Sequence, residues 1–160
     1  MRDLHVRAAT AADRAAVVGL LSASWGGTTV VGHGTVYDAA ELPALVAERD
    51  GALAGLLTYA LSGDGLEVVT VDAAVRHSGV GSALLAAAAE TARGAGARRL
   101  WLVTTNDNLD ALRFYQRRGL RIVGVAPGAV DAARRLKPSI PGTGRYGIPL
   151  HDELTLELRL

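Results

Sequence analysis

The sequence contains no cysteine, which excludes disulfide bonds and metal sites built on thiolates. Aromatic residues make up only 4% of the chain, so we expect a core built mainly from Leu, Val and Ala. The first ten residues, MRDLHVRAAT, lack the apolar segment of a signal peptide. The most apolar stretch, residues 52–61, is too short to span a bilayer. These absences predict a cytoplasmic protein without a membrane partner.

The charges also lack a dominant sign. The chain has 17 Lys and Arg residues against 16 Asp and Glu residues, and the basic residues are scattered. A basic stripe is typical of nucleic-acid binding, so we expect no nucleic-acid partner. The four histidines show no metal-ligand spacing, and no metal is expected. A length of 160 residues predicts a single domain, residues 1–160, with a full hydrophobic core.

Hydrophobic periodicity and turn residues predict a mixed α/β chain. A helix is expected to begin after Thr10 and to end near residues 22–25, whereas residues 26–40 are expected to be a loop with at most a short strand or turn. Residues 137–149 hold three prolines and three glycines, and they are either a functional loop or a surface linker. Further helices are predicted over 79–93, 107–118 and 129–136, and strands over 4–8, 45–48, 53–61, 66–71, 99–105, 120–125 and 154–160.

The most informative segment is Arg76-His77-Ser78-Gly79-Val80-Gly81, between a predicted strand and a predicted helix. Glycines let the backbone approach a bulky anion, and the start of a helix favours negative charge. The segment therefore predicts a pyrophosphate cradle that extends to Ser82. A dinucleotide fingerprint does not fit, because Leu84 stands where the third glycine would be, and the sequence has no Walker A string.

A second motif lies downstream, from Asn108 through Ala111, Phe114 and Tyr115 to Gly119. The two motifs, R-x-x-G-x-G and N-x-x-A-x-x-F-Y-x-x-x-G, resemble those of the GNAT superfamily of N-acetyltransferases, in the same order and at about the same spacing. Leu120 replaces the family's final aromatic residue. The resemblance covers roughly residues 2–126. It implies a GNAT-like α/β fold with a central, mostly antiparallel sheet flanked by helices, and acetyl-CoA as cofactor.

The resemblance also implies catalytic roles. Tyr115 occupies the position of the family's general acid, and the alternative is a core tyrosine with its hydroxyl at the surface. Glu67 is the candidate base, acting directly or through a water, and the alternative is a solvated strand carboxylate. Asp72 is expected to be a turn or rim group. The residues expected to bind the cofactor are Val71, Ala73, Arg76, His77, Ser78, Gly79, Val80, Gly81, Ser82 and Asn108, and the last of these is alternatively a polar residue of the first helical turn.

The acceptor site is less strongly indicated. Asp152 and Glu153 would suit an ammonium group, while Lys137 or Arg145 would suit a carboxylate. For each of these residues, a loop or surface charge remains the alternative. The predicted substrate-binding residues are Trp25, Lys137, Asp152 and Glu153, with His33, Tyr37, Arg134, Arg145 and His151 as further candidates.

The predicted function is transfer of an acetyl group from acetyl-CoA directly to a primary amine of a small molecule, an amino acid or an aminated metabolite. No covalent acyl-enzyme is expected, because the chain has no cysteine and no supported Ser-His pair. Two alternatives stay open: acetylation of protein N-termini or lysines, and a non-catalytic CoA-binding sensor domain. Exposed sheet edges leave a homodimer as an option.

Overall fold

The computed structural model describes residues 3–75 and 77–160, and its chain forms two compact units. The first unit contains the residues up to Val30, Asp38–Leu100 and Leu160, and the second contains Val31–Tyr37 and Trp101–Arg159. A single domain over residues 1–160 stays a prediction. No helix in the described part of the chain is long and apolar enough to cross a membrane.

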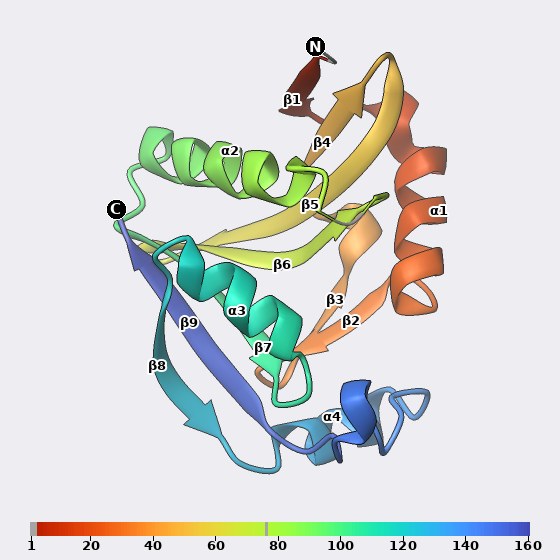
Figure 1. The fold of residues 1–160 in the computed structure, drawn as a ribbon, viewed down its shortest axis with the longest axis vertical. Coiled ribbons are helices and arrows are strands. Elements are labelled where there is room, and N and C mark those ends of the chain that lie inside the picture. Colours follow the sequence, from red (N-terminus) through yellow and green to blue (C-terminus); the bar gives the residue numbers. More distant parts are fainter. Residues whose placement is uncertain (1–2, 76) are drawn as a thin grey trace. The chain divides into compact units, whose positions relative to one another are not determined.

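The first unit is an antiparallel sheet with helices packed on it (Figure 1). Its strands are hydrogen-bonded in the order β1-β4-β5-β6, so the strands predicted over 45–48, 53–61 and 66–71 pair in chain order and β1 lies at their edge. The elements are β1 (Leu4–Ala8), η1 (Ala11–Asp13), α1 (Arg14–Trp25), η2 (Ala39–Glu41), β4 (Ala44–Arg49), β5 (Ala52–Ser62), β6 (Gly65–Ala73) and α2 (Val80–Gly94).

The second unit contains the strand order β7-β9-β8, with β8 and β9 antiparallel. Its elements are β7 (Arg99–Thr105, which begins at the unit boundary), α3 (Leu109–Arg117), β8 (Arg121–Ala126), α4 (Ala129–Leu136), η3 (Arg145–Gly147) and β9 (Glu153–Arg159). The predicted bounds of β1, β7 and α4 match those of the structure, and most other predicted bounds differ by one or two residues.

Residues 26–40 differ most from the sequence prediction of a loop with a short strand or turn, because residues 29–38 form a two-stranded sheet. Its strands are β2 (Thr29–Gly32) and β3 (Thr35–Asp38). His33 and Gly34, which join them, both have positive φ angles, of 41° and 76°. Two such residues make the tight turn that matches the twist of paired strands. A non-glycine residue seldom adopts this conformation, which is why His33 gave no hairpin signal.

Different helices pack on the two faces of the first sheet, because successive side chains along β5 point to opposite faces. Leu56 packs in a buried cluster with Val17 and Leu21 of α1. Gly55 is the preceding residue, and a Cβ built there would point to the opposite face, where Val80 and Leu84 of α2 approach it. A Cβ at this position would lie 2.8 Å from the backbone oxygen of Asp72. The absence of a side chain at Gly55 therefore lets α2 and the end of β6 approach β5 closely.

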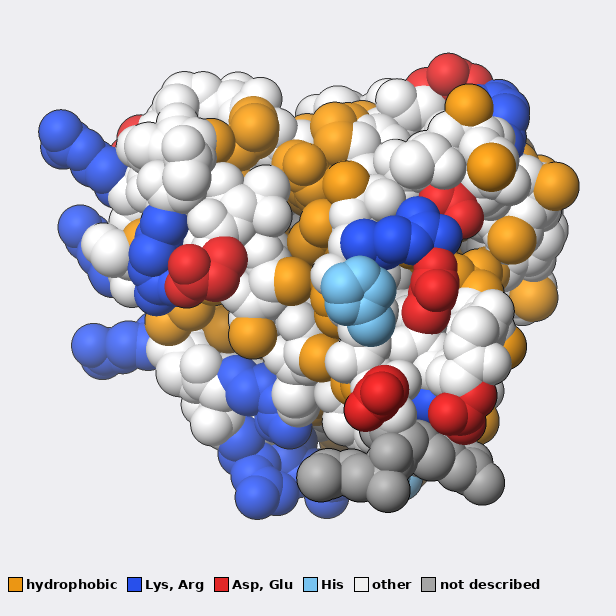
Figure 2. Space-filling model, turned by 90° about the horizontal axis from the view of Figure 1, so that it is seen from above, with side chains coloured by type: hydrophobic (Ala, Val, Ile, Leu, Met, Phe, Trp, Pro, Cys, Tyr) orange, Lys and Arg blue, Asp and Glu red, His pale blue; other side chains and the backbone are white. Residues whose placement is uncertain are grey.

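An ion-pair network fixes the start of the chain to the sheet. Arg7 of β1 donates to both carboxylate oxygens of Asp13, at 2.8 and 2.9 Å, and to Glu48 of β4 at 2.6 Å. Asp13 also accepts the backbone N–H of Thr10 at 2.7 Å, as expected for a capping box. Figure 2 shows basic and acidic side chains next to one another on the face that it displays.

We expect Asp13→Asn to destabilise the protein at neutral pH and much less in acid. Arg7 holds the pKa of Asp13 well below its ordinary value. A lowered pKa stabilises the fold fully above the unfolded-state pKa of about 3.9, and this contribution is lost progressively as the pH falls from there through the lowered folded-state pKa. Asparagine can still accept the Thr10 N–H, so the variant removes chiefly the charge.

Thermal unfolding of both proteins at pH 7, 5 and 3 measures this effect. The gap between the melting temperatures should be widest at pH 7 and pH 5 and should be smaller at pH 3. Glu90→Gln is the matched control, because the Glu90–Arg93 pair is exposed and should contribute little at any pH. A gap between wild type and Asp13→Asn that is the same at all three pH values would contradict the assignment.

Candidate functional site

The loop before α2 has the features expected of an anion cradle. Gly79 caps the helix in the left-handed conformation, with φ 83°. The N–H groups in the first turn of a helix have no partner within the helix, and the first turn of α2 carries no acidic residue. Arg76, which the sequence predicts to add a positive charge here, lies outside the described residues. The described part of the cradle, residues 77–82, therefore fits a pyrophosphate.

The structure adds an arginine to this cradle that the sequence did not reveal. Arg49, the last residue of β4, donates from Nη2 to the backbone oxygen of Ser78 at 3.0 Å. The Ser78 hydroxyl donates to the backbone oxygen of Val75 at 2.6 Å. Nε of Arg49 is buried and has no hydrogen-bond partner among the described residues. A guanidinium with spare donor capacity beside the loop also favours an anionic ligand.

Strand β6 carries the predicted base and two of the residues that are expected to bind the cofactor. Val71 and Ala73 lie opposite Leu57 and Gly55 of β5, so the strand continues two residues beyond its predicted end. Glu67 is only 4% exposed. Burial contradicts the alternative interpretation of Glu67 as a solvated strand carboxylate, while its role as a base stays a prediction.

The end of β6 joins two residues that the sequence analysis treated separately. The indole Nε1 of Trp25, at the end of α1, donates to Oδ2 of Asp72 at 2.9 Å. Burial raises the pKa of Asp72, and hydrogen bonds from Trp25 and Ser24 partly oppose this rise. A half-buried carboxyl with a raised pKa is a candidate for proton transfer. Sequence reasoning missed Asp72 in this role, because nothing in the local pattern indicates that α1 reaches it.

Asn108 and Asp107 organise the start of α3. Oδ1 of Asn108 caps the helix by accepting the backbone N–H of Ala111 at 3.3 Å, which confirms its alternative role as a first-turn polar residue. The same oxygen accepts Nη1 of Arg145 at 2.6 Å. Asp107 is buried and accepts the backbone N–H of Arg145 at 2.9 Å. Both contacts of Asn108 use its oxygen, so a contact of its amide nitrogen with the cofactor stays a prediction.

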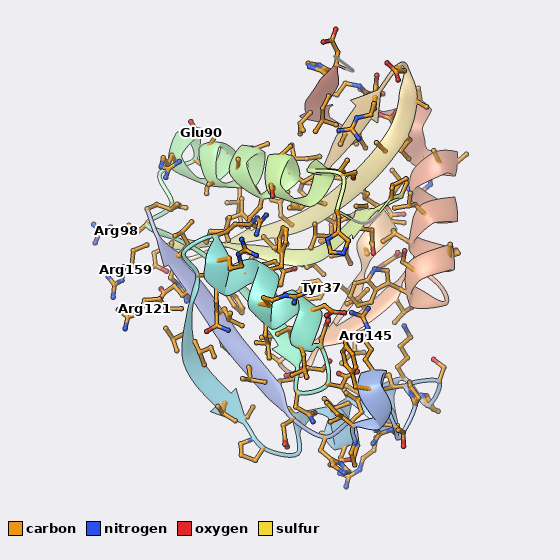
Figure 3. The ribbon with its side chains drawn as sticks, viewed as in Figure 1. Tyr37, Glu90, Arg98, Arg121, Arg145 and Arg159 are labelled. Carbon is orange, nitrogen blue, oxygen red and sulfur yellow. The ribbon has the colours of Figure 1, made fainter. Side chains whose placement is uncertain are left out.

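The segment 137–149 is folded against α3 and α4, as Figure 3 illustrates at Arg145. The Arg134 guanidinium of α4 donates to the backbone oxygens of Ile140 and Pro141, at 3.0 and 2.8 Å. The Tyr146 hydroxyl donates to Asp110 of α3 at 2.7 Å. At the end of the segment, the Asn106 amide donates to the backbone oxygen of Pro149 at 2.9 Å. These contacts favour an ordered loop over a surface linker.

Three of the predicted substrate residues lie in the second unit, and the structure gives two of them separate partners. Oδ1 of Asp152 accepts the backbone N–H of Gly128, just before α4, at 2.8 Å. Glu153 is buried and accepts the backbone N–H of His33 at 3.1 Å. Their neighbouring positions in sequence therefore do not make them a pair on one ligand. Burial lowers the pKa of Lys137, the residue after α4.

The second unit also holds the predicted acid and an aromatic cluster. Tyr115 of α3 is 7% exposed, with its ring 5.3 Å from that of Phe114. On the β2–β3 turn, the His33 ring lies 5.1 Å from the Trp101 ring, and its Nε2 lies 3.3 Å from the Tyr37 hydroxyl. Over residues 3–75 and 77–160 the structure contains no group of His, Cys, Asp and Glu suited to a metal ion.

Comparison with known proteins relates this geometry to one family. Residues 32–120 match the model of the acetyltransferase (GNAT) family. An uncharacterized protein of Bacillus subtilis, YdhI, is 37% identical over 131 residues, which are 81% of this chain and 82% of that protein. A streptothricin acetyltransferase of Streptomyces lavendulae is 36% identical over 80 residues, or 48% of this chain and 42% of that enzyme.

Solved structures share the fold across nearly the whole chain. An IAA acetyltransferase from Bacillus cereus superposes with a TM-score of 0.78 at 20% identity, covering 99% of this chain and 100% of its own. A putative acetyltransferase from Salmonella typhimurium, solved with its cofactor acetyl-CoA, gives a TM-score of 0.70 at 20% identity over 98% and 94% of the two chains. The likeness confirms the expected mixed α/β fold with a large, mostly antiparallel sheet flanked by helices.

Proposed function

The chain belongs to the GNAT family of acetyltransferases, and on this basis we propose that it transfers an acetyl group from acetyl-CoA directly to a primary amine of a small molecule. The acceptor class is an amino acid or another aminated metabolite. Acetyl-CoA is supported by the cofactor bound to the related Salmonella typhimurium protein and by the residues around the start of α2.

The cofactor would be held by residues of both predicted motifs. The N–H groups of residues 79–82 and the guanidinium of Arg76 would bind its pyrophosphate, with Arg49 fixing the loop through Ser78. The backbone of Val71 and Ala73 would bind the pantetheine arm, together with the amide of Asn108. When bound, the cofactor supplies an activated acetyl group in its thioester. The protein's contribution is position, a polarised carbonyl and proton transfer.

Proton transfer is needed at two atoms. An alkyl ammonium has a pKa of about 10.4, so fewer than about one molecule in a thousand is neutral at pH 7. A carboxylate on β6 would accept this proton, with Glu67 as the candidate from the sequence. Tyr115 would donate its phenolic proton to the leaving thiolate, because a phenol of pKa about 10 can protonate or hydrogen-bond a group whose acid form has pKa near 8.5.

The observation that favours a small acceptor is that hydrogen bonds hold the segment 137–149 in an ordered conformation. Arg134 holds residues 140 and 141, Asp110 holds Tyr146 and Asn106 holds Pro149, so the segment is a fixed part of the second unit. A protein substrate would need an extended open groove, whereas an ordered loop of this length limits the size of what binds beside it. The similarity to a streptothricin acetyltransferase agrees with this choice.

Thermal unfolding with acetyl-CoA, NADH or ATP tests the cofactor assignment. Acetyl-CoA at 100 times its dissociation constant should stabilise the protein by about 2.7 kcal/mol. For a chain of this size this is a rise of roughly 5–10 °C in melting temperature. NADH and ATP should give much smaller shifts. A shift with NADH or ATP alone would contradict the assignment.

Turnover is then measured with a thiol reagent that detects the released CoA, since the cysteine-free protein adds no thiol signal of its own. The panel holds amino acids, polyamines and amino-sugar compounds, with peptides bearing a free N-terminus or an internal lysine as the comparison. Faster turnover of the small amines is expected. Turnover of peptides alone would favour a protein acetyltransferase, and acetyl-CoA binding without turnover of any amine would favour a CoA-binding sensor.

A further inference from the structure

The carboxyl group of Asp72 is held in one orientation by a helix distant in sequence. Nε1 of Trp25 donates to its Oδ2 at 2.9 Å, and a hydrogen bond from the Ser24 side chain also acts on it. Both donors are neutral groups at the end of α1. They orient the carboxylate without neutralising its charge, so it keeps the ability to accept a proton.

Asp72 is also better placed than Glu67 to meet an amine that enters from solvent. It directly follows Val71 in β6 and is half-buried, whereas Glu67 lies five positions earlier and is 4% exposed. At about 3.3 Å per residue, the backbones of the two positions lie at most about 16 Å apart along the strand, and a β-bulge between them shortens this separation. A direct proton transfer near the Val71 backbone is therefore open to Asp72, while Glu67 would have to act through intervening water.

We propose that Asp72, fixed by Trp25 and Ser24, is the carboxylate that accepts the proton of the acceptor ammonium. The inference rests on the proposed function and narrows its substrate class to amines that arrive as cations. Asp72 takes one proton from the ammonium nitrogen and passes it to water. The freed nitrogen lone pair forms the C–N bond, the C–S bond breaks, and the thiolate is protonated by Tyr115. The second nitrogen proton restores the phenol.

The surroundings of Asp72 determine how its protonation should respond to mutation. Burial raises its pKa, and the Trp25 and Ser24 donors lower it. Its partner on β5 is Leu56, and the other carboxylate on β6 is Glu67. The next described ionisable residue along the chain is His77. Removal of the indole donor should therefore raise the pKa of Asp72, so that the carboxylate forms only at higher pH.

The test is the pH dependence of kcat/KM for a responsive amine in the wild type and in three variants: Asp72→Asn, Trp25→Phe and Glu67→Gln. In the wild type, kcat/KM should fall as the pH is lowered, and this fall is the acid limb of the pH profile. Asp72→Asn should lower kcat/KM by about 100-fold or more and remove this acid limb. Asparagine can still accept the indole N–H, so the fold is expected to persist. Trp25→Phe should move the limb to higher pH, and Glu67→Gln should still show the limb, whatever the size of its kcat/KM.

Three outcomes would overturn the inference. The first is Asp72→Asn with an unchanged rate and acid limb, and the second is loss of the limb in Glu67→Gln. The third is a folded Trp25→Phe whose limb stays in place, which tests the inference even if Asp72→Asn does not fold. If the wild type itself acetylates no amine, the proposed function fails and the inference fails with it. Normal wild-type turnover with any of the first three outcomes refutes the role of Asp72 alone.

Discussion

Tyr115→Phe should lower kcat by about 100-fold to 1,000-fold and leave the affinity for acetyl-CoA nearly unchanged. Tyr115 is buried in α3, and phenylalanine keeps the ring that packs there. The substitution removes only the hydroxyl proton that the proposed mechanism gives to the leaving thiolate. Because this interaction is made in the transition state, kcat should fall much more than KM rises.

Steady-state kinetics and acetyl-CoA titration by calorimetry measure the two quantities separately. Tyr59→Phe on β5 is the matched control, because it also removes one phenolic hydroxyl, at a residue outside the proposed site. Its kcat should stay within about twofold of the wild type. An equal loss of activity and acetyl-CoA affinity in Tyr115→Phe would indicate a structural role, and an unchanged kcat would contradict the assignment of the acid.

Gly55→Ala should destabilise the protein by about 1–3 kcal/mol and weaken acetyl-CoA binding as well. The added Cβ would meet the Val80 side chain at the start of α2 and would lie 2.8 Å from the backbone oxygen of Asp72. A backbone oxygen in a strand cannot rotate away. The strain must therefore move the end of β6 or the start of α2, which are the two elements that flank the cradle.

Chemical denaturation gives the free energy of unfolding, and calorimetry gives the affinity of the folded fraction. Gly19→Ala in α1 is the control, because a Cβ there meets nothing within 4 Å. An alanine inside a helix should stabilise it by about 0.5–1 kcal/mol relative to glycine. If Gly55→Ala were as stable as the wild type, the close approach of α2 to β5 would be wrong.

The periodic elements were predictable because their patterns are local. The segments 99–105 and 129–136 were predicted with the bounds that the structure shows, since one has a strand composition and the other ends before a proline. The β2–β3 hairpin was missed, because its turn places His33 at a positive φ that only tertiary surroundings maintain. Among those surroundings is the buried Glu153 carboxylate, which accepts the His33 backbone N–H.

In the candidate site, too, the local motifs were predictable from the sequence and the contacts between distant elements were not. The two motifs made the proposed cradle and Tyr115 predictable, because each motif is a set of residue types at fixed spacing. The partners from distant elements, Arg49 at Ser78 and Trp25 at Asp72, were not predictable. Each contact joins residues 29 or 47 positions apart, and no local pattern encodes which strand end meets which loop.

The sequence by itself identified the family, the order of most elements and a candidate anion cradle, because each depends on residue types at short, fixed intervals. The tertiary structure decided what each charged side chain contacts. It gave Asp152 and Glu153 separate backbone partners and buried Glu67. It also raised the pKa of Asp72 by burying the carboxyl beside Trp25. Burial and long-range hydrogen bonds set the chemistry of a carboxylate, and both arise only when distant segments pack together.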